Sequence, residues 1–183
     1  MTLASEYESR LIPWSDLQGH MPFLRQTAQD YHEPVIIELG TRTGQSTSAF
    51  LAAIETYGGE LWSVDIDEAQ VPSHWRGLPY WHFLRADDLH PAAQAWLPQR
   101  CDILFIDTSH EYGHTLAELR IYAPRVLPGG VVLCHDTQFE PPGHDRGTPD
   151  GEVAQALDTY CKEAGLSWEN RPGFYGLGTI IQR

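Results

Sequence analysis

The chain has 183 residues, with 12 Lys and Arg against 25 Asp and Glu, and a formal net charge of -13 at pH 7. This length suffices for one domain core of ordinary size and is too short for two, so we expect a single domain over residues 1–183. Nucleic acid and anionic membranes are excluded as favoured partners, because binding to phosphates requires Lys and Arg.

Residues 1–33 are predicted to form an N-terminal segment of one or two helices before the main body of the domain. Acidic residues occur early, and the unbroken apolar region of a secretory signal is missing. Three cysteines lie far apart without a CxxC pair, which argues against a disulfide framework. No apolar run approaches the roughly 20 residues that a bilayer crossing needs. We therefore expect a cytoplasmic protein without a membrane segment.

Residues 34–183 alternate short apolar runs with longer segments at helical spacing. This alternation is typical of a parallel sheet wound with crossover helices. Helices are predicted at 43–57 and 114–127, and the Pro-Gly-Gly triplet at 128–130 is expected to end the second of them. The predicted strands of the parallel sheet are 35–39, 61–66, 80–86, 102–107 and 131–136.

The C-terminal part of the chain departs from this alternation. A loop at 138–151, rich in Pro, Gly and Asp, is long enough to lie over a functional site. A helix is predicted at 152–165. Residues 166–182 then indicate two strands joined by a turn at Pro172 and Gly173, so the sheet should end in a hairpin.

The glycine loop at 40–44, GTRTG, follows the first predicted strand and indicates a ligand site. A phosphate-binding P-loop would have Lys after the second glycine, where this chain has Gln45. A dinucleotide site would have glycine at Arg42, so a pyrophosphate ligand is disfavoured. A tight turn at Gly40, with Gly44 opening a helix, instead suits a ligand without phosphate, such as an amino-acid group.

Acidic residues at the ends of three successive predicted strands extend this candidate site. Glu38 lies at the end of the first, and Asp65 ends the second, where α/β nucleoside sites place a carboxylate on the ribose hydroxyls. Asp87 follows the third and can accept a hydrogen bond from an adenine amino group. Each alone is more often a solvated carboxylate, but three in register point to a nucleoside.

Three segments then resemble the class I S-adenosylmethionine-dependent methyltransferases: ELGTRTGQST (38–47), SVDID (63–67) and CDILFIDTSHEYGHTLAELRIYAPRVLPGGVVLCHDT (101–137). The likeness is greatest to the small-molecule and sugar O-methyltransferases that carry FIDGDH-type and HD motifs. YGLGTI at 175–180 resembles the last strand of that group. The resemblance implies an α/β fold with a Rossmann-like, doubly wound, mostly parallel seven-stranded sheet that ends in a C-terminal antiparallel hairpin.

The resemblance also implies that the chain uses S-adenosylmethionine to methylate a small-molecule hydroxyl. It would place the cofactor against the glycine loop and the acids that follow the first three strands. The cofactor-binding residues that it implies are Glu38, Gly40, Thr41, Gly44 and Ser46 around the methionine group, Asp65 at the ribose and Asp87 at the adenine.

Metal-dependent relatives hold a divalent ion at the ends of the fourth and fifth strands, which the resemblance matches to Asp107, Asp136 and Thr137. Oxygen ligands of this kind suit Mg²⁺, so Mg²⁺ is considered as a second cofactor. Thr137 stands where these relatives commonly have Asp or Asn. Thr108 and Ser109 replace the usual Gly and Asp after Asp107.

His110, three residues after Asp107, is predicted to act with it as the catalytic pair. An imidazole with an unperturbed pKa of about 6.5 can take the proton of an acceptor hydroxyl, whereas Ser109 cannot. His110 could instead cap the helix that follows. His135 precedes Asp136 on a strand, so it is expected on the opposite face, in a structural role.

Three classes of function remain after this reading. The favoured one is transfer of a methyl group to a small-molecule hydroxyl, with Mg²⁺ assisting. The missing acid at Ser109 leaves open a non-catalytic cofactor-binding or scaffold protein. Nucleic-acid methylation is disfavoured by the charge and by the absence of an NPPY-like motif. The short N-terminus offers little material for a lid, so a homo-oligomer, in which a second subunit covers the site, is also considered.

Overall fold

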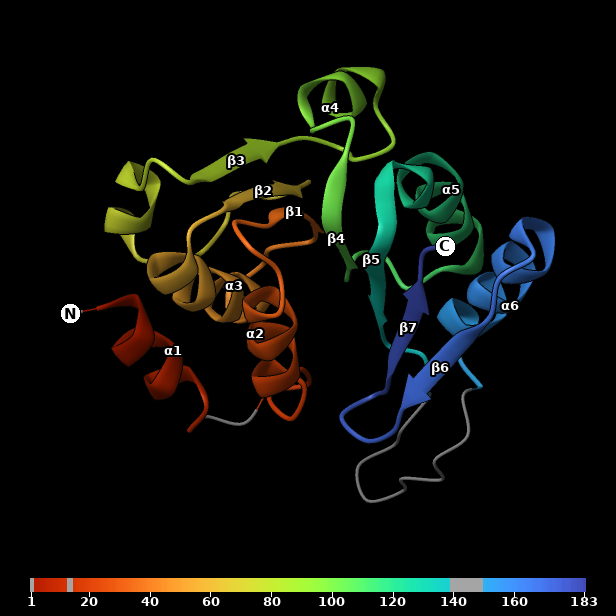
Figure 1. The fold of residues 1–183 in the computed structure, drawn as a ribbon, viewed down its shortest axis with the longest axis horizontal. Helices are drawn as coiled ribbons and strands as arrows, with labels where there is room; N and C mark the ends of the chain where they lie inside the picture. The colour runs from red at the N-terminus through yellow and green to blue at the C-terminus, as the bar shows by residue number, and fades with distance from the viewer. Residues whose placement is uncertain (1, 13–14, 139–149) are drawn as a thin grey trace.

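The computed structural model describes residues 2–12, 15–138 and 150–183. Its centre is a seven-stranded sheet in the order β3-β2-β1-β4-β5-β7-β6 (Figure 1). β7 pairs antiparallel with β5 and β6, and every other pairing is parallel. This arrangement confirms the predicted fold. The strands are β1 (Val35–Leu39), β2 (Glu60–Asp65), β3 (Trp81–Arg85), β4 (Cys101–Ile106), β5 (Val126–His135), β6 (Trp168–Arg171) and β7 (Leu177–Ile181).

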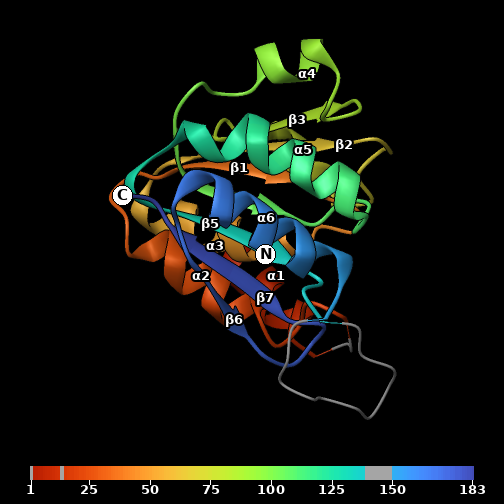
Figure 2. The ribbon, with the colours of Figure 1, turned by 90° about the vertical axis from the view of Figure 1, so that its right-hand side faces the viewer.

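Helices cover both faces of the sheet. Figure 1 shows α1, α2 and α3 together, and Figure 2 turns the molecule so that α5 and α6 lie nearest the viewer. None of the helices in the described ranges is long and apolar enough to cross a membrane. The helices are α1 (Leu3–Arg10), α2 (Met21–Gln29), α3 (Gln45–Tyr57), α4 (Pro91–Trp96), α5 (Tyr112–Tyr122) and α6 (Glu152–Ala164), with short 3-10 helices at Ser73–Gly77 and Ala123–Arg125.

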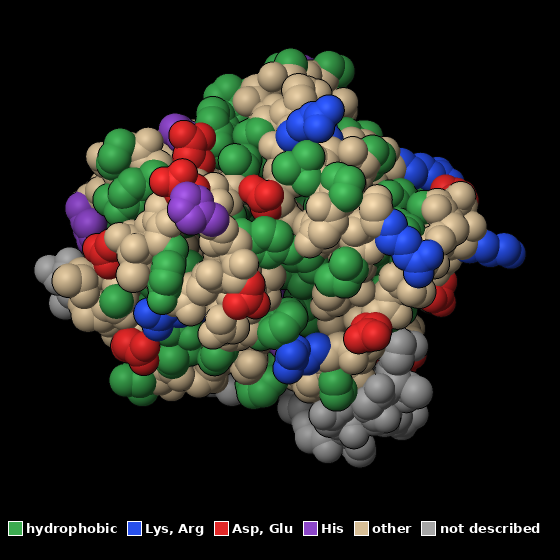
Figure 3. Space-filling model, in the orientation of Figure 1, with side chains coloured by type: hydrophobic (Ala, Val, Ile, Leu, Met, Phe, Trp, Pro, Cys, Tyr) green, Lys and Arg blue, Asp and Glu red, His purple; other side chains and the backbone are tan. Residues whose placement is uncertain are grey.

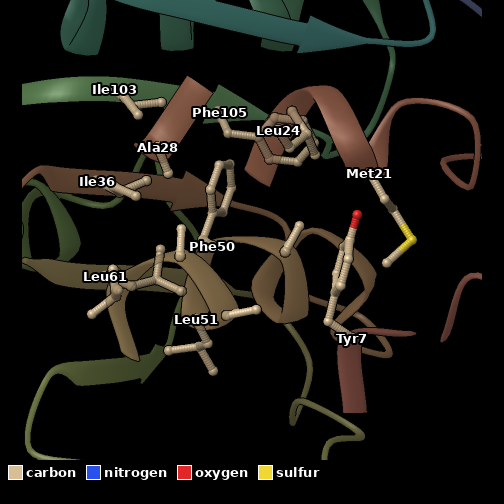
Figure 4. Close-up of a cluster of buried hydrophobic side chains, with 14 of the residues drawn as sticks. Tyr7, Met21, Leu24, Ala28, Ile36, Phe50, Leu51, Leu61, Ile103 and Phe105 are labelled. Carbon is tan, nitrogen blue, oxygen red and sulfur yellow. The ribbon is translucent and has the colours of Figure 1, made fainter. Parts of the chain in front are cut away.

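The central strands are buried on both faces, which explains their unbroken apolar sequences. Side chains alternate along a strand, so Ile36 packs into the core on the side of α1 to α3, and Ile37 into the core on the side of α4 to α6. In the first core, the rings of Phe50 from α3 and Phe105 from β4 meet edge to face at 5.8 Å (Figure 4). This packing holds α3 against β4.

One predicted boundary is wrong. The helix expected at 114–127 ends at Tyr122, and the triplet at 128–130 lies inside β5. Gly129 has φ +84°, and its N–H donates to the Gln182 carbonyl at 2.9 Å. A Cβ on Gly130 would lie 2.5 Å from the Asp102 carbonyl oxygen. The two glycines therefore form an irregularity in the β4–β5 pairing, where they continue the strand instead of preceding it.

Candidate functional site

The glycine loop connects the end of β1 to the start of α3 and depends on two left-handed glycines. Gly40 has φ +89°, and a Cβ there would lie 1.9 Å from the Asp107 carbonyl oxygen. Gly44, the N-cap of α3, has φ +78°, and a Cβ there would lie 2.7 Å from Val71 Cγ1. Glycine is required at both positions, because any side chain would push the loop away from its neighbours.

Asp65, at the end of β2, fastens this loop. Its Oδ2 accepts hydrogen bonds from the N–H groups of Thr41 at 2.8 Å and Arg42 at 2.7 Å, and Oδ1 accepts one from Asp67 N–H at 2.8 Å. Each carboxylate oxygen can accept more than one hydrogen bond. Asp65 can therefore hold the loop and still accept from a ligand in the pocket beside it.

Two pockets open at the carboxyl ends of the parallel strands. The larger has a volume of about 470 Å³, and its lining includes Asp65, Asp87 and the apolar side chain of Ile66. Ile66 is 68% exposed, so its apolar surface is free to pack against a planar ring. The volume lies within the range of about 300–1,000 Å³ that is usual for small-molecule sites.

The second pocket, of about 250 Å³, is lined by Thr41, Ser46 and His110 among others. Both pockets include Gly40 and Asp107, so the glycine loop and the end of β4 separate them. The Thr41 hydroxyl is buried and has no hydrogen-bond partner among the described residues. An unpaired buried hydroxyl in a pocket wall is suited to bind a polar group of a ligand.

Glu38 is placed differently from the direct cofactor contact that the resemblance implied. It is fully buried beneath the loop and lines neither pocket. Its carboxylate accepts hydrogen bonds from the hydroxyls of Ser46 at 2.7 Å, Thr47 at 2.9 Å and Ser63 at 2.6 Å. Burial raises the pKa of Glu38 to about 7, although the three hydroxyls oppose the increase. Glu38 thus ties β1, β2 and α3 together under the site.

This burial predicts a pH effect on stability that Glu38→Gln should remove. The pKa of Glu38 rises on folding from 4.5 to about 7, so the folded protein binds the proton more readily than the unfolded chain does. The stabilisation that protonated Glu38 contributes is fully present below pH 4.5 and is lost as the pH rises through 7. The free energy of unfolding should fall by up to about 3 kcal/mol over this range. Urea unfolding at pH 5 and pH 8 should show this fall in the wild type, and a smaller fall in Glu38→Gln.

The matched control for that comparison is Glu169→Gln, which removes an exposed carboxylate on β6. It should keep the pH dependence of the wild type. An equal pH dependence in Glu38→Gln and Glu169→Gln would show that Glu38 does not change its pKa on folding.

Asp107 and Asp136, after β4 and at the end of β5, form a compact cluster with two histidines. His110 Nε2 lies 3.1 Å from Asp107 Oδ1 and 3.0 Å from Asp136 Oδ2. His135 Nδ1 lies 3.4 Å and 3.0 Å from the same two oxygens. The two acids and two imidazoles alternate around a ring, which we call the Asp107–Asp136 cluster.

The charges of this cluster support one another. Burial alone would raise the pKa of Asp107, but His135 and His110 hold it well below its usual range. The hydrogen bond to Asp107 raises the pKa of His110. Burial alone would lower the pKa of His135, but the carboxylates of Asp107 and Asp136 raise it well above its usual value. The Asp107 carboxylate is therefore held ionised beside the two imidazoles.

The expectation that His135 lies on the face opposite Asp136 is wrong, because its Nδ1 lies 3.0 Å from Asp136 Oδ2. Asp136 has φ +60°, which ends the alternation of the strand. The side chains of His135 and Asp136 therefore both lie beside Asp107. The HD motif shows in the sequence that His135 and Asp136 are adjacent. The positive φ at Asp136, which brings their side chains together, is visible only in the structure. His110 also has a positive φ, +59°, and it does not cap α5, whose N-cap is Glu111 with no side-chain capping bond.

Thr137 lies beside the cluster, but its hydroxyl is turned to another partner. It is buried and donates to Asn170 Oδ1 of β6 at 2.6 Å. The candidate metal group at this end of the sheet consists of Asp107, His110 and Asp136, whose ligand atoms lie within 4.8 Å of one another. The predicted loop at 138–151 falls mostly at 139–149, outside the described residues.

Residues 37–137 match the methyltransferase domain family, and they make up more than half of the chain. The chain belongs to this family. Its membership confirms the predicted methyltransferase, and the matched residues contain the glycine loop, Asp65, Asp87 and the Asp107–Asp136 cluster. A comparison with curated protein sequences finds no match.

Several solved methyltransferases share the fold at low identity. The methyltransferase PaMTH1 of Podospora anserina, bound to SAH, is 15% identical with a TM-score of 0.66, over 99% of this chain and 87% of that one. An O-methyltransferase of Bacillus cereus in complex with SAH is 15% identical with a TM-score of 0.65, over 98% and 90%. MycE of the mycinamycin pathway, with Mg, SAH and mycinamycin VI, is 16% identical with a TM-score of 0.67, over 99% of this chain but 53% of that one.

Proposed function

We propose that this methyltransferase transfers the methyl group of S-adenosylmethionine to a hydroxyl of a small molecule. The observation that carries the proposal is the pair of pockets that meet at Gly40 and Asp107. One has the size and the carboxylates for a nucleoside, and the other contains His110. The SAH in the Podospora and Bacillus proteins, and the small-molecule complex of MycE, support this assignment.

In this proposal the larger pocket binds the adenosine half of the cofactor. Asp65 accepts from the ribose hydroxyls, Asp87 accepts from the adenine amino group, and Ile66 packs on the adenine face. The methionine half passes over Gly40 toward the smaller pocket, where the unpaired Thr41 hydroxyl and Ser46 line the wall. Glu38 acts as a positioning residue, because it holds the loop from below.

Bound S-adenosylmethionine would supply a methyl group on a sulfonium: the acceptor oxygen would attack the methyl carbon in line, and the C–O bond would form as the C–S bond breaks and SAH leaves. The chain has to align the acceptor and remove its proton. His110 Nε2 is the group we assign to that proton transfer, since His110 lines the smaller pocket beside Asp107. Because the carboxylates raise the pKa of His110, its neutral, basic form increases as the pH rises through that pKa.

Asp107 and Asp136 would hold a divalent ion through their carboxylate oxygens, which leaves His110 Nε2 available as the base. Two carboxylate oxygens at adjacent strand ends fit Mg²⁺, which keeps several water ligands of its own. A bound ion would lower the pKa of the acceptor hydroxyl and fix its position. The role expected for Thr137 in this site would require its hydroxyl to turn from Asn170.

The proposal treats residues 1–183 as one methyltransferase domain, with 1–33 as an N-terminal segment on the core. Leu17 and Asp16 of that segment line the smaller pocket, so it would help to bind the acceptor. On the face of the molecule seen in the orientation of Figure 1, Figure 3 shows Lys and Arg side chains scattered among acidic and apolar ones. This distribution favours a small-molecule acceptor over a nucleic acid.

A non-catalytic cofactor-binding protein is the second candidate. Ser109 in place of an acid favours it, as does the raised pKa of His110, because less of the predicted base is then neutral at a given pH. Both candidates require cofactor binding, so turnover of an acceptor separates them.

Cofactor binding is tested by Asp65→Ala. Loss of hydrogen bonds from the ribose hydroxyls to a charged acceptor, each worth roughly 1.5–3 kcal/mol, should weaken S-adenosylmethionine binding by about one to two orders of magnitude. Calorimetric titration with S-adenosylmethionine measures the change in affinity, once in buffer with Mg²⁺ and once in buffer with a chelator.

The control is Asp67→Ala, which removes a neighbouring carboxylate that lines neither pocket, with the same change of charge. Its affinity should equal that of the wild type. If a folded Asp65→Ala protein binds as tightly as Asp67→Ala, the ribose assignment is wrong.

A further inference from the structure

A second cluster of possible metal ligands lies apart from the Asp107–Asp136 cluster. Asp88 follows β3, and His114 and Glu118 lie one turn apart on α5. The ligand atoms of these three residues lie within 4.8 Å of one another. Asp88 and His114 also line the larger pocket. We call these residues the Asp88–Glu118 cluster.

Its distances match those between the ligands of a tetrahedral ion. His114 Nε2 lies 3.1 Å from Asp88 Oδ1 and 3.6 Å from Glu118 Oε1. Ligands at about 2.0–2.2 Å from a tetrahedral Zn²⁺ are separated from one another by about 3.3–3.6 Å. The side chains could therefore bind such an ion with only small movements.

The cluster also contains a buried oxygen that no described residue satisfies. Glu118 is fully buried, and its Oε2 has no hydrogen-bond partner among the residues that the structure describes. Asp88 is 8% exposed, and its Oδ1 lies 3.1 Å from His114 Nε2. Buried polar atoms are nearly always paired, so the unpaired oxygen of the fully buried Glu118 carboxylate points to a missing ligand.

The surroundings orient these side chains as outer partners of metal ligands do. The Thr108 hydroxyl donates to Glu118 Oε1 at 2.9 Å, and the Tyr122 hydroxyl donates to the backbone carbonyl of Asp88. Hydrogen bonds of this kind hold ligands in place around an ion. Without an ion, two largely buried carboxylates share a single imidazole, and burial raises the pKa of Glu118.

We propose that Asp88, His114 and Glu118 bind a divalent transition-metal ion of the zinc type, with the fourth position open to the larger pocket. An imidazole among the ligands favours Zn²⁺ over Mg²⁺, which prefers oxygen. The dication would balance the two carboxylates and give the unpaired Glu118 Oε2 a partner. The inference does not rest on the proposed methyl transfer, because the ion can be measured without cofactor or acceptor.

The experiment is calorimetric titration of Zn²⁺ into chelator-treated protein: wild type, His114→Gln, Glu118→Gln and, as the matched control, His110→Gln. His110→Gln removes the imidazole from the other cluster. The wild type and His110→Gln should bind Zn²⁺ at this site, and both His114→Gln and Glu118→Gln should bind it at least about 10–100-fold more weakly, since even the loss of an outer partner has an effect of that size.

Co²⁺ gives a second measurement, because tetrahedral Co²⁺ has a strong visible absorption that octahedral Co²⁺ lacks. The band should appear in the wild type and in His110→Gln and be absent from His114→Gln. Circular dichroism in metal-free buffer checks that each variant is folded, and Glu118→Gln serves if His114→Gln is not. Absence of Zn²⁺ binding in the wild type, or binding that only His110→Gln removes, would overturn the proposal.

Discussion

His110→Ala is expected to lower methyl transfer by about 10²–10⁴-fold, the usual loss when a positioned base is removed. His110 Nε2 lies within 3.1 Å of a carboxylate oxygen of both Asp107 and Asp136, at the wall of the smaller pocket. The variant should bind S-adenosylmethionine almost normally, since His110 does not line the larger pocket. Steady-state rates with a hydroxyl acceptor, together with calorimetry of cofactor binding, measure the two effects.

The pH profile adds a separate check on the same residue. Wild-type turnover should rise with pH, because Asp107 raises the pKa of His110 and only the neutral imidazole accepts a proton. The difference in turnover rate between His110→Ala and the wild type should become smaller at high pH, because the acceptor hydroxyl ionises there without a base.

His90→Ala is the control, because His90 caps α4 through a bond from Ala92 N–H to its ring nitrogen at 3.2 Å. It should lose about 0.5–2 kcal/mol of stability and keep its turnover. Full turnover in His110→Ala would show that His110 is not the base. The acceptor would then be activated by an ion on Asp107 and Asp136, or by alignment alone.

Gly40→Ala is expected to destabilise the protein by more than about 3 kcal/mol. A φ of +89° strains any residue with a Cβ, and the added methyl would lie 1.9 Å from the Asp107 carbonyl oxygen, which is backbone and cannot turn aside. For a chain of this length, that loss lowers the melting temperature by at least about 6 °C. Thermal and urea unfolding measure it directly.

The same substitution should disturb the site, because the ends of β1 and β4 must separate to admit the methyl group. Cofactor affinity should fall together with stability. The matched control is Gly113→Ala, on α5, where nothing lies within 4 Å of the added Cβ. It should change stability by no more than about 1 kcal/mol, with a gain favoured. Equal melting temperatures for Gly40→Ala and Gly113→Ala would refute the close approach of β1 and β4.

The two substitutions illustrate what could be read from the sequence. Gly40 and Asp107 were both predicted as site residues, from a loop pattern and from a family resemblance. Their backbone contact across the β1–β4 pairing was not predictable, because it depends on which strands are neighbours. Glu38 shows the same limit: the sequence predicts it in the pocket wall, but it lies buried beneath the loop, where the Ser63 hydroxyl of the neighbouring strand β2 donates to it.

By itself, the sequence determined the α/β class, the order of the main elements and the acids at the ends of successive strands. These features are local: apolar periodicity follows the geometry of one helix or strand, and a glycine in a turn reflects the φ of its own residue. The methyltransferase prediction had the same basis, since its motifs are short and occur in order along the chain.

Only the tertiary structure decided which side chains meet. His110, His135 and the two acids come together because β4 and β5 are neighbours and because the backbone turns to a positive φ at Asp136. Asp88 meets His114 and Glu118 because the segment after β3 lies against α5. The glycines at 129 and 130 lie inside β5, although their sequence pattern predicts the end of a helix before that strand. Such contacts join residues distant along the chain, so their geometry depends on packing, which no local pattern records.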